Sequence, residues 1–223
     1  MNHPTSRSTN NHFIIGVEGP AGSGKSTMAN TVGRDMGITV IEGGSYYRLL
    51  TYAALSDCIA LTDTDRLVKL ASDMPIRFSQ SENGDIFSNG VLITNELRTE
   101  RISTKVAEVS GHLAVREIVE EQIKNAVLAH KTSIVVGRWI KKLFPDAYVL
   151  NLTIDPEEAE RRHVSRTNGQ PQSVRERNDA DISTAQKLGV VAGAHEASID
   201  VTYMTADEQA TALKDFITAC AMK

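Results

Sequence analysis

The sequence predicts an α/β fold with a parallel, doubly wound sheet. Short apolar runs the length of a strand alternate with segments of helical periodicity along the whole chain, which is typical of this fold class. A glycine-rich turn lies directly between the first apolar run and the first helix. Ligands of such sheets bind beyond the carboxyl ends of the strands, so we expect the functional site at that edge.

The expected elements follow from periodicity and from residues that begin or end helices. The expected strands are 13–17, 38–41, 132–136, 147–154 and 199–203. The expected helices are 25–36, 45–61, 63–74, 96–130, 156–192 and 206–222. Gly37 is expected to end the first helix in the left-handed conformation, and Asp63 to cap the third. Residues 75–95 alternate with period two around two Asn-Gly pairs, which predicts a small antiparallel β insert.

Composition excludes several classes of protein. The chain has 223 residues, 41% hydrophobic and 23% charged, with a formal net charge of -4. This composition is typical of a globular protein, and without a basic excess we expect no binding of nucleic acid or of a membrane. No apolar run approaches the roughly 20 residues that span a bilayer. We expect a disordered polar tail at 1–11, before one domain at 12–223.

The two cysteines bear on the cellular compartment. Cys58 and Cys220 are far apart in the chain and form no disulfide framework and no Cys-x-x-Cys pair. This usage favours a reducing compartment, so we expect a cytoplasmic protein.

The strongest functional signal is the segment Gly19-Pro20-Ala21-Gly22-Ser23-Gly24-Lys25-Ser26-Thr27, which has the spacing of a phosphate-binding loop. Its glycines allow backbone N–H groups to converge on the phosphates of ATP at a helix N-terminus. Lys25 is expected to reach the outer phosphates, and the Ser26 hydroxyl to bind magnesium. Glu18, at the end of the strand, is expected to hold the water shell of that ion. A turn that binds nothing is the alternative, but a Lys-Ser pair at a helix start has little structural use.

A phosphate loop alone does not separate kinases from GTPases and ATPases. The chain has no Asn-Lys-x-Asp guanine signature and is short, which leaves small kinases. From Ile14 to its end, the chain resembles the cytidylate kinase family. The resemblance rests on the loop and on the segments 42–48, 87–90, 95–100, 115–117, 137–138, 144–147 and 177–181.

The resemblance implies that the terminal phosphoryl group of ATP is transferred to a nucleoside monophosphate or nucleotide-like acceptor. It places the insert at 75–95 on the acceptor side and a helical lid at 156–185. It implies that the acceptor is bound by Arg48, Arg116, Arg138 and Arg177, with Asp181 near its sugar. Catalysis is then expected from Lys25, Arg138, Arg162 and Arg177, with Arg161 binding ATP. The charged run 157–162 is equally typical of a solvent-exposed helix face, so the role of both lid arginines stays open.

The sequence departs from the family pattern at polar positions of the acceptor site. Val136 and Trp139 replace the aspartates on either side of Gly-Arg, Ala107 and Gly43 replace hydroxyl residues, and Thr184 replaces a lid arginine. Trp139 either stacks on a ring of the acceptor or fills the core. Lost polar contacts reduce discrimination, so we expect altered base specificity.

Two other functions stay open from the sequence. One is a kinase that acts on a hydroxyl of a nucleoside or another small metabolite. The other is a catalytically weak nucleotide-binding regulator, which Val136 and Trp139 favour and the retained Lys25 and Ser26 oppose. A monomer or a homodimer is expected in either case.

Overall fold

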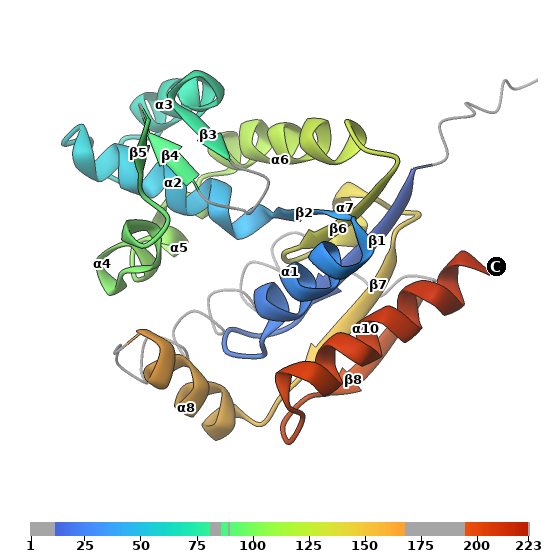
Figure 1. The fold of residues 1–223 in the computed structure, drawn as a ribbon. Helices are drawn as coiled ribbons and strands as arrows, with labels where there is room; N and C mark the ends of the chain where they lie inside the picture. Colours follow the sequence, from blue (N-terminus) through green and yellow to red (C-terminus); the bar gives the residue numbers. More distant parts are fainter. Residues whose placement is uncertain (1–11, 81–85, 89, 168–194, 223) are drawn as a thin grey trace, which may run out of the picture.

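The computed structural model describes residues 12–80, 86–88, 90–167 and 195–222. Five parallel strands form the central sheet in the order β2-β6-β1-β7-β8 (Figure 1). These strands are β1 (Phe13–Glu18), β2 (Thr39–Glu42), β6 (Thr132–Val136), β7 (Tyr148–Thr153) and β8 (Glu196–Asp200). The predicted α/β fold with a parallel sheet is confirmed.

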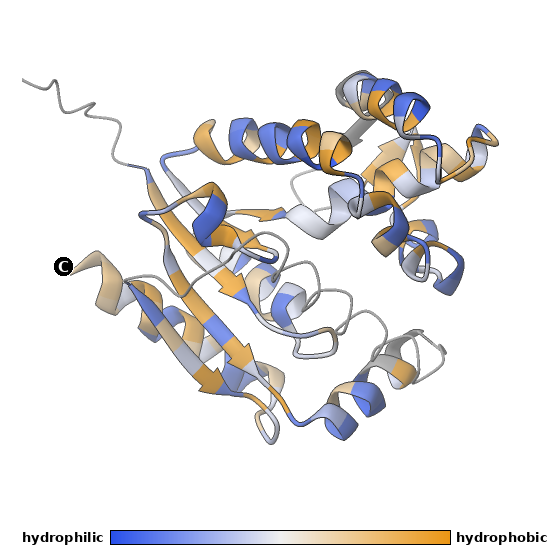
Figure 2. Cartoon of the chain, turned by 180° about the vertical axis from the view of Figure 1, so that it is seen from behind, coloured by the Kyte–Doolittle hydropathy of each residue, from blue (hydrophilic) through white to orange (hydrophobic). Residues whose placement is uncertain are grey.

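Helices bury both faces of the sheet. On one face, α1 (Lys25–Met36) and α10 (Ala206–Ala221) pack over strand residues that include Ile134 and Val136. On the other face, Val135 belongs to a cluster with α2 (Gly43–Ser56), α3 (Thr64–Arg77) and α6 (Leu113–Leu128). Successive residues of a strand point to opposite faces, which is why the apolar run of β6 serves both clusters. Seen from behind, the strands are mostly apolar (Figure 2).

The predicted ends of two helices agree with the structure. Gly37 has φ 66° and ψ 31° and ends α1. The carboxylate of Asp63 accepts a hydrogen bond of 3.1 Å from the Arg66 N–H at the start of α3. No helix in the described part of the chain is long and apolar enough to cross a membrane.

The predicted antiparallel insert is present as β3 (Phe78–Gln80), β4 (Ile86–Ser88) and β5 (Val91–Leu92). It begins later than residue 75, because α3 continues through Pro75 as far as Arg77. Proline lacks the N–H of a helical hydrogen bond and disfavours a long continuation, but its fixed φ near −65° is helical, and the helix runs only two residues beyond it.

The prediction of one helix over 96–130 is wrong. The segment contains η1 (Glu96–Arg98), α4 (Glu100–Ser103), α5 (Val106–Ser110) and α6. The backbone is extended at Thr99 (ψ 154°) and at His112 (ψ 114°). The His112 ring holds the second break in place, since its nitrogens lie 2.7 Å from the Leu61 carbonyl oxygen and 2.8 Å from the Thr64 hydroxyl. These contacts between distant segments have no signature in the helical periodicity.

Four other elements differ from expectation. The helix expected over 45–61 is α2, which ends at Ser56. The last strand is Glu196–Asp200 rather than 199–203, because it pairs with β7 from Val149↔Glu196 to Thr153↔Asp200. A short helix that was not expected, α7 (Ile140–Leu143), follows β6. Of the helix predicted over 156–192, the described part is α8 (Pro156–Thr167), so the rest of the predicted lid lies outside the described residues.

Candidate active site

A cavity of about 640 Å³ lies at the carboxyl ends of the strands, between the phosphate loop and helices α2, α4, α5 and α6. The loop contributes Gly22, Gly24, Lys25 and Ser26, and Glu42 comes from the end of β2. The other walls come from α2, the helices between the insert and α6, α6 itself, and the segment after β6. The cavity therefore lies at the sheet edge that the fold class predicts.

The phosphate loop depends on its glycines. Gly19, Gly22 and Gly24 have φ of 143°, 86° and 90°, a backbone conformation that other residues rarely adopt. A Cβ on Gly19 would lie 2.6 Å from the Leu152 carbonyl oxygen, and one on Gly24 would lie 2.6 Å from the side-chain oxygen of Gln209. The loop is thus pressed against β7 and α10, and its glycines leave room for a close approach of backbone to phosphate.

Lys25 and Ser26 lie at the start of α1 and line the cavity. The Lys25 ammonium donates hydrogen bonds of 2.7 Å to the carbonyls of both Gly19 and Pro20. The loop thereby curves around the ammonium group and fixes it beside the backbone that would receive phosphates. No group of three or more Asp, Glu, His or Cys side chains in the described ranges is arranged to hold a metal ion.

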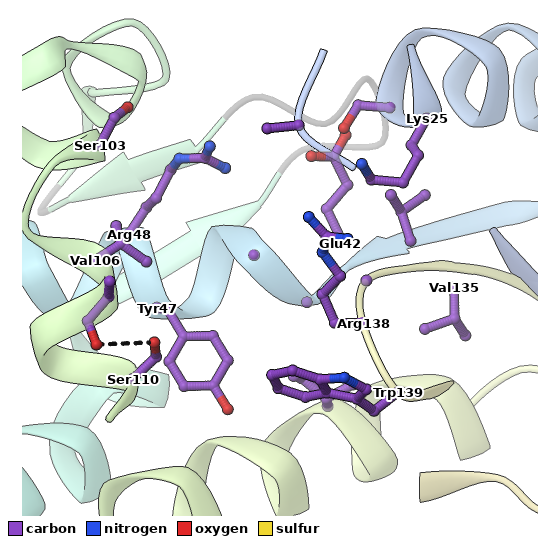
Figure 3. A pocket seen from close by; sticks show the side chains of 18 of the residues that line it. Lys25, Glu42, Tyr47, Arg48, Ser103, Val106, Ser110, Val135, Arg138 and Trp139 are labelled. Carbon is purple, nitrogen blue, oxygen red and sulfur yellow. Dashed lines mark hydrogen bonds between the residues drawn. The ribbon is translucent and has the colours of Figure 1, made fainter. Parts of the chain in front are cut away.

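Four arginine side chains line the cavity outside the phosphate loop. Arg48 comes from α2, Arg98 from η1, Arg116 from α6, and Arg138 from the segment after β6. Figure 3 shows Arg48, Arg138 and Lys25 reaching into one space. Guanidinium groups bind phosphate oxygens with two parallel hydrogen bonds, so these walls fit an anionic ligand.

Arg116 lies within cation–π distance of two aromatic rings. Its guanidinium carbon lies 4.9 Å from the centre of the Trp139 ring and 5.4 Å from that of Tyr47. It also donates to the Glu120 carboxylate at 3.3 Å and to the Ser110 carbonyl at 3.0 Å, and the residue is 7% exposed. Cation–π contacts of this kind stabilise a desolvated arginine. Arg116 is therefore built into the cavity wall.

Trp139 and Tyr47 form the aromatic part of this wall. Trp139 is half-buried, lines the cavity and has a left-handed backbone with φ 54°. That conformation costs a non-glycine residue about 1–2 kcal/mol. Burial raises the pKa of Tyr47 to about 12, so its phenol stays neutral beside Arg116. Figure 3 shows the indole beside the Tyr47 ring and below Arg138.

Glu18 ends β1 and contacts the segment that carries Trp139. Its carboxylate accepts a hydrogen bond of 2.6 Å from the Ile140 N–H. Burial raises the pKa of Glu18, while the N–H groups of Ile140 and Trp139 and the charge of Arg138 act in the opposite direction. The carboxylate expected to serve magnesium thus binds the loop after β6.

The two lid arginines do not line the cavity in this structure. Arg162 donates to the carbonyls of Val201 at 2.9 Å and Thr202 at 2.8 Å and to the Glu158 carboxylate at 2.7 Å. Arg161 also pairs with Glu158 at 2.7 Å, and its side chain is 72% exposed. The structure therefore places Arg162 in a contact between α8 and the end of β8.

Besides Trp139, three positions that depart from the family pattern border the cavity. Val136 is buried in the cluster beneath α1 and lines the cavity from there, and Ala107 and Gly43 line it without a polar side chain. Arg177, Asp181 and Thr184 lie outside the described residues.

Glu42, Tyr47, Arg98 and Ser103 also line the cavity, although they are not among the expected site residues. Glu42, Tyr47 and Arg98 lie in segments that carry the family resemblance. Their place in these segments could have identified them as site residues. Ser103 has no comparable signal, because its place depends on the break between α4 and α5.

Comparison with known proteins agrees with this geometry. The sequence model described as "Cytidylate kinase" matches residues 15–218. The chain belongs to the cytidylate kinase family. It is 32% identical to a cytidylate kinase of Shouchella clausii over 92% of this chain and 96% of that protein. It is 35% identical to a cytidylate kinase of Bacillus cereus over 78% of this chain and 79% of that protein.

Among solved structures, the chain is similar in fold to a gluconokinase from Sinorhizobium meliloti. The TM-score is 0.51 at 15% identity, covering 95% of this chain and 94% of that one. The expected family is thus confirmed, and with it a phosphotransferase with a phosphate loop.

Proposed function

We propose that this member of the cytidylate kinase family transfers the γ-phosphoryl group of ATP to a nucleotide-like acceptor that carries a phosphate. One observation carries the proposal: a single cavity has the phosphate loop on one side and Arg48, Arg98 and Arg138 on the other. Phosphoryl transfer needs the donor phosphate and the attacking oxygen held in line with the charge neutralised, and little other chemistry from the protein. A phosphate-bearing acceptor adds a second anion, which the arginines would neutralise.

The chain's own residues divide this work. The backbone N–H groups of the loop and Lys25 hold the donor phosphates, and Arg138, on the opposite wall, adds positive charge beside the moving phosphoryl group. Arg48 orients the acceptor, as Arg177 and Asp181 are expected to do. Fixed cations of this kind stabilise charge on the moving phosphoryl group without reorganising. We keep the catalytic role of Arg162 and the ATP contact of Arg161 as expectations for a closed lid.

Ser26 fits a magnesium site shared with ATP. It lines the cavity at the end of the phosphate loop, and the glycines of that loop leave room for the phosphates. Bound there, magnesium would neutralise charge on the outer phosphates. We further propose a cytoplasmic monomer or homodimer.

We also propose that base specificity differs from that of a CMP kinase. Two hydrogen bonds of Arg116 go to Glu120 and Ser110, and both aromatic rings lie within cation–π distance, which leaves less of the guanidinium for a base. Ala107 and Gly43 offer no side-chain hydroxyl. Each missing contact in a desolvated site costs about 1–3 kcal/mol, so two of them reduce selection for cytosine by roughly two orders of magnitude.

The test is a coupled ADP-release assay over nucleoside monophosphates, nucleosides and phosphorylated metabolites. We expect turnover of a phosphate-bearing acceptor other than CMP, with CMP and dCMP as poor substrates. A kcat/KM for CMP on the order of 10⁵ M⁻¹s⁻¹ or higher would contradict the altered specificity. Retained ATP binding without turnover of any acceptor would favour the regulator.

A kinase for a hydroxyl acceptor is the second candidate, and Glu42 favours it. Its side chain lines the cavity (Figure 3). Its carboxylate accepts a hydrogen bond of 2.9 Å from the Asn30 amide. A hydroxyl must lose its proton during transfer, whereas an acceptor phosphate is already ionised. Glu42→Gln should therefore reduce kcat by roughly 10²-fold or more with a hydroxyl acceptor and much less with a phosphate acceptor.

A further inference from the structure

Glu18 and Trp139 are connected through the backbone of the segment after β6. Strand β1 holds this segment at two points: the Val17 carbonyl accepts a hydrogen bond of 3.3 Å from the Gly137 N–H, and the Glu18 carboxylate accepts one of 2.6 Å from the Ile140 N–H. Trp139 lies between these two points in the left-handed conformation. A side chain 122 residues away in sequence thus helps to fix the backbone of Trp139.

The conformation of Trp139 matters for the acceptor side of the cavity. Its ring lies over the guanidinium of Arg116, and the neighbouring Arg138 reaches into the same space. A strained conformation of this kind persists only where surrounding contacts determine it. Loss of the Glu18 contact therefore disturbs the ring and both arginines together.

We propose that Glu18 is a positioning residue, whose carboxylate holds the segment 137–140 and thereby sets the aromatic and cationic wall that receives the acceptor. That this wall receives the acceptor rests on the proposed function. That Glu18 fixes the backbone of Trp139 does not. It assigns Glu18 a role different from the expected support of the magnesium water shell.

Two conservative variants separate the two roles. Glu18→Asp keeps the charge but shortens the side chain by about 1.5 Å, which is too much for a hydrogen bond of 2.6 Å to survive without movement of the loop. Glu18→Gln keeps the length and an oxygen that accepts the Ile140 N–H, but loses the charge. If Glu18 positions the segment, Glu18→Asp should impair acceptor binding more than Glu18→Gln does. If Glu18 serves the metal, Glu18→Gln should be the more damaging of the two variants.

Trp139 supplies a readout that does not depend on activity, because it is the only tryptophan in the chain. We expect Glu18→Asp to shift the emission of the protein alone and to increase its quenching by acrylamide at least twofold. The KM for the acceptor should rise at least tenfold, while the KM for ATP and the magnesium requirement change less than threefold. Glu18→Gln should change each of these less than Glu18→Asp does.

Each outcome decides a separate question. A wild-type emission spectrum in Glu18→Asp, or a magnesium requirement raised more by Glu18→Gln than by Glu18→Asp, would overturn the positioning role. A spectral change in a protein that phosphorylates no acceptor would support the role while contradicting the proposed function. If Glu18→Asp does not fold, Glu18→Gln decides: an unchanged magnesium requirement with a small spectral shift supports positioning, and a raised requirement overturns it.

Discussion

The guanidinium carbon of Arg116 lies 4.9 Å from the centre of the Trp139 ring, in the wall of the cavity. The family resemblance of the sequence implies an aspartate at position 139. An aspartate there would attract the guanidinium by charge, whereas the indole covers one of its faces and adds aromatic surface. Under the proposed change of base specificity, the indole offers the acceptor an aromatic surface where an aspartate would offer a hydrogen-bonding group, and Arg116 is retained. Trp139 is therefore not the buried core residue that the sequence allowed as an alternative.

The first prediction concerns this position. Trp139→Asp should raise kcat/KM for CMP at least tenfold, because it restores a hydrogen-bonding group beside Arg116. Trp139→Phe is the matched control, since it keeps an aromatic face and should keep the wild-type preference. Steady-state kinetics over the nucleotide panel measure both. Unchanged preference in a folded Trp139→Asp protein would show that position 139 does not determine specificity.

The second prediction concerns Lys25. Lys25→Ala should reduce kcat by roughly 10²-fold or more, because it removes a cation from the donor phosphates, while circular dichroism stays that of a folded protein. The loop carbonyls of Gly19 and Pro20 that accept its hydrogen bonds lie beside the cavity and can be hydrated instead. Lys131→Ala, an exposed position before β6, is the control and should leave kcat unchanged. Near-normal turnover of Lys25→Ala would contradict the kinase assignment.

Much of the fold follows from the sequence, because strand-length apolar runs and helical periodicity are local properties. The phosphate loop is local as well, so its residues are predictable from spacing alone. The contacts that shape the acceptor wall are not local. Arg116 lies in α6 and Trp139 in the segment after β6, and they meet only in the folded chain. Neither segment alone shows that the Arg116 guanidinium packs on the Trp139 ring.

Two further differences have the same cause. Glu18 lies directly before the loop, so its position suggests a metal, but its hydrogen bond goes to Ile140, a neighbour only in the folded chain. Arg162 lies in a run typical of a solvated helix face, yet its guanidinium meets the Val201 and Thr202 carbonyls. Tertiary contacts, which the local pattern does not show, determine where both side chains lie in this structure.

The third prediction concerns Arg48, which reaches into the acceptor side of the cavity. If the acceptor carries a phosphate, Arg48→Ala should raise its KM by roughly 10- to 100-fold, the loss expected for a charge-assisted hydrogen bond. The KM for ATP should change less than threefold. Arg34→Ala, at an exposed position of α1, is the control for loss of one positive charge. Equal losses for both substrates would place Arg48 with the donor instead.

The last prediction is a pH dependence at the contact between α8 and the rest of the domain. Hydrogen bonds from Arg161 and Arg162 lower the pKa of Glu158 to about 2, from an ordinary value of 4.5. The folded state therefore favours the charged carboxylate. The charged Glu158 carboxylate therefore stabilises the folded state fully above about pH 4.5, and this contribution is lost as the pH falls towards about 2.

Glu158→Gln removes this titration and should lower the thermal midpoint at pH 7. The gap between wild type and variant should narrow below about pH 4.5 and close near pH 2, in melting curves followed by circular dichroism. Glu157→Gln is the matched control, because the Glu157 side chain, one residue earlier in α8, makes no ion pair with a described residue. A gap that stays constant from pH 7 to pH 3 would mean that the Glu158 carboxylate adds no pH-dependent stability. Arg162 would then be held by the Val201 and Thr202 carbonyls alone.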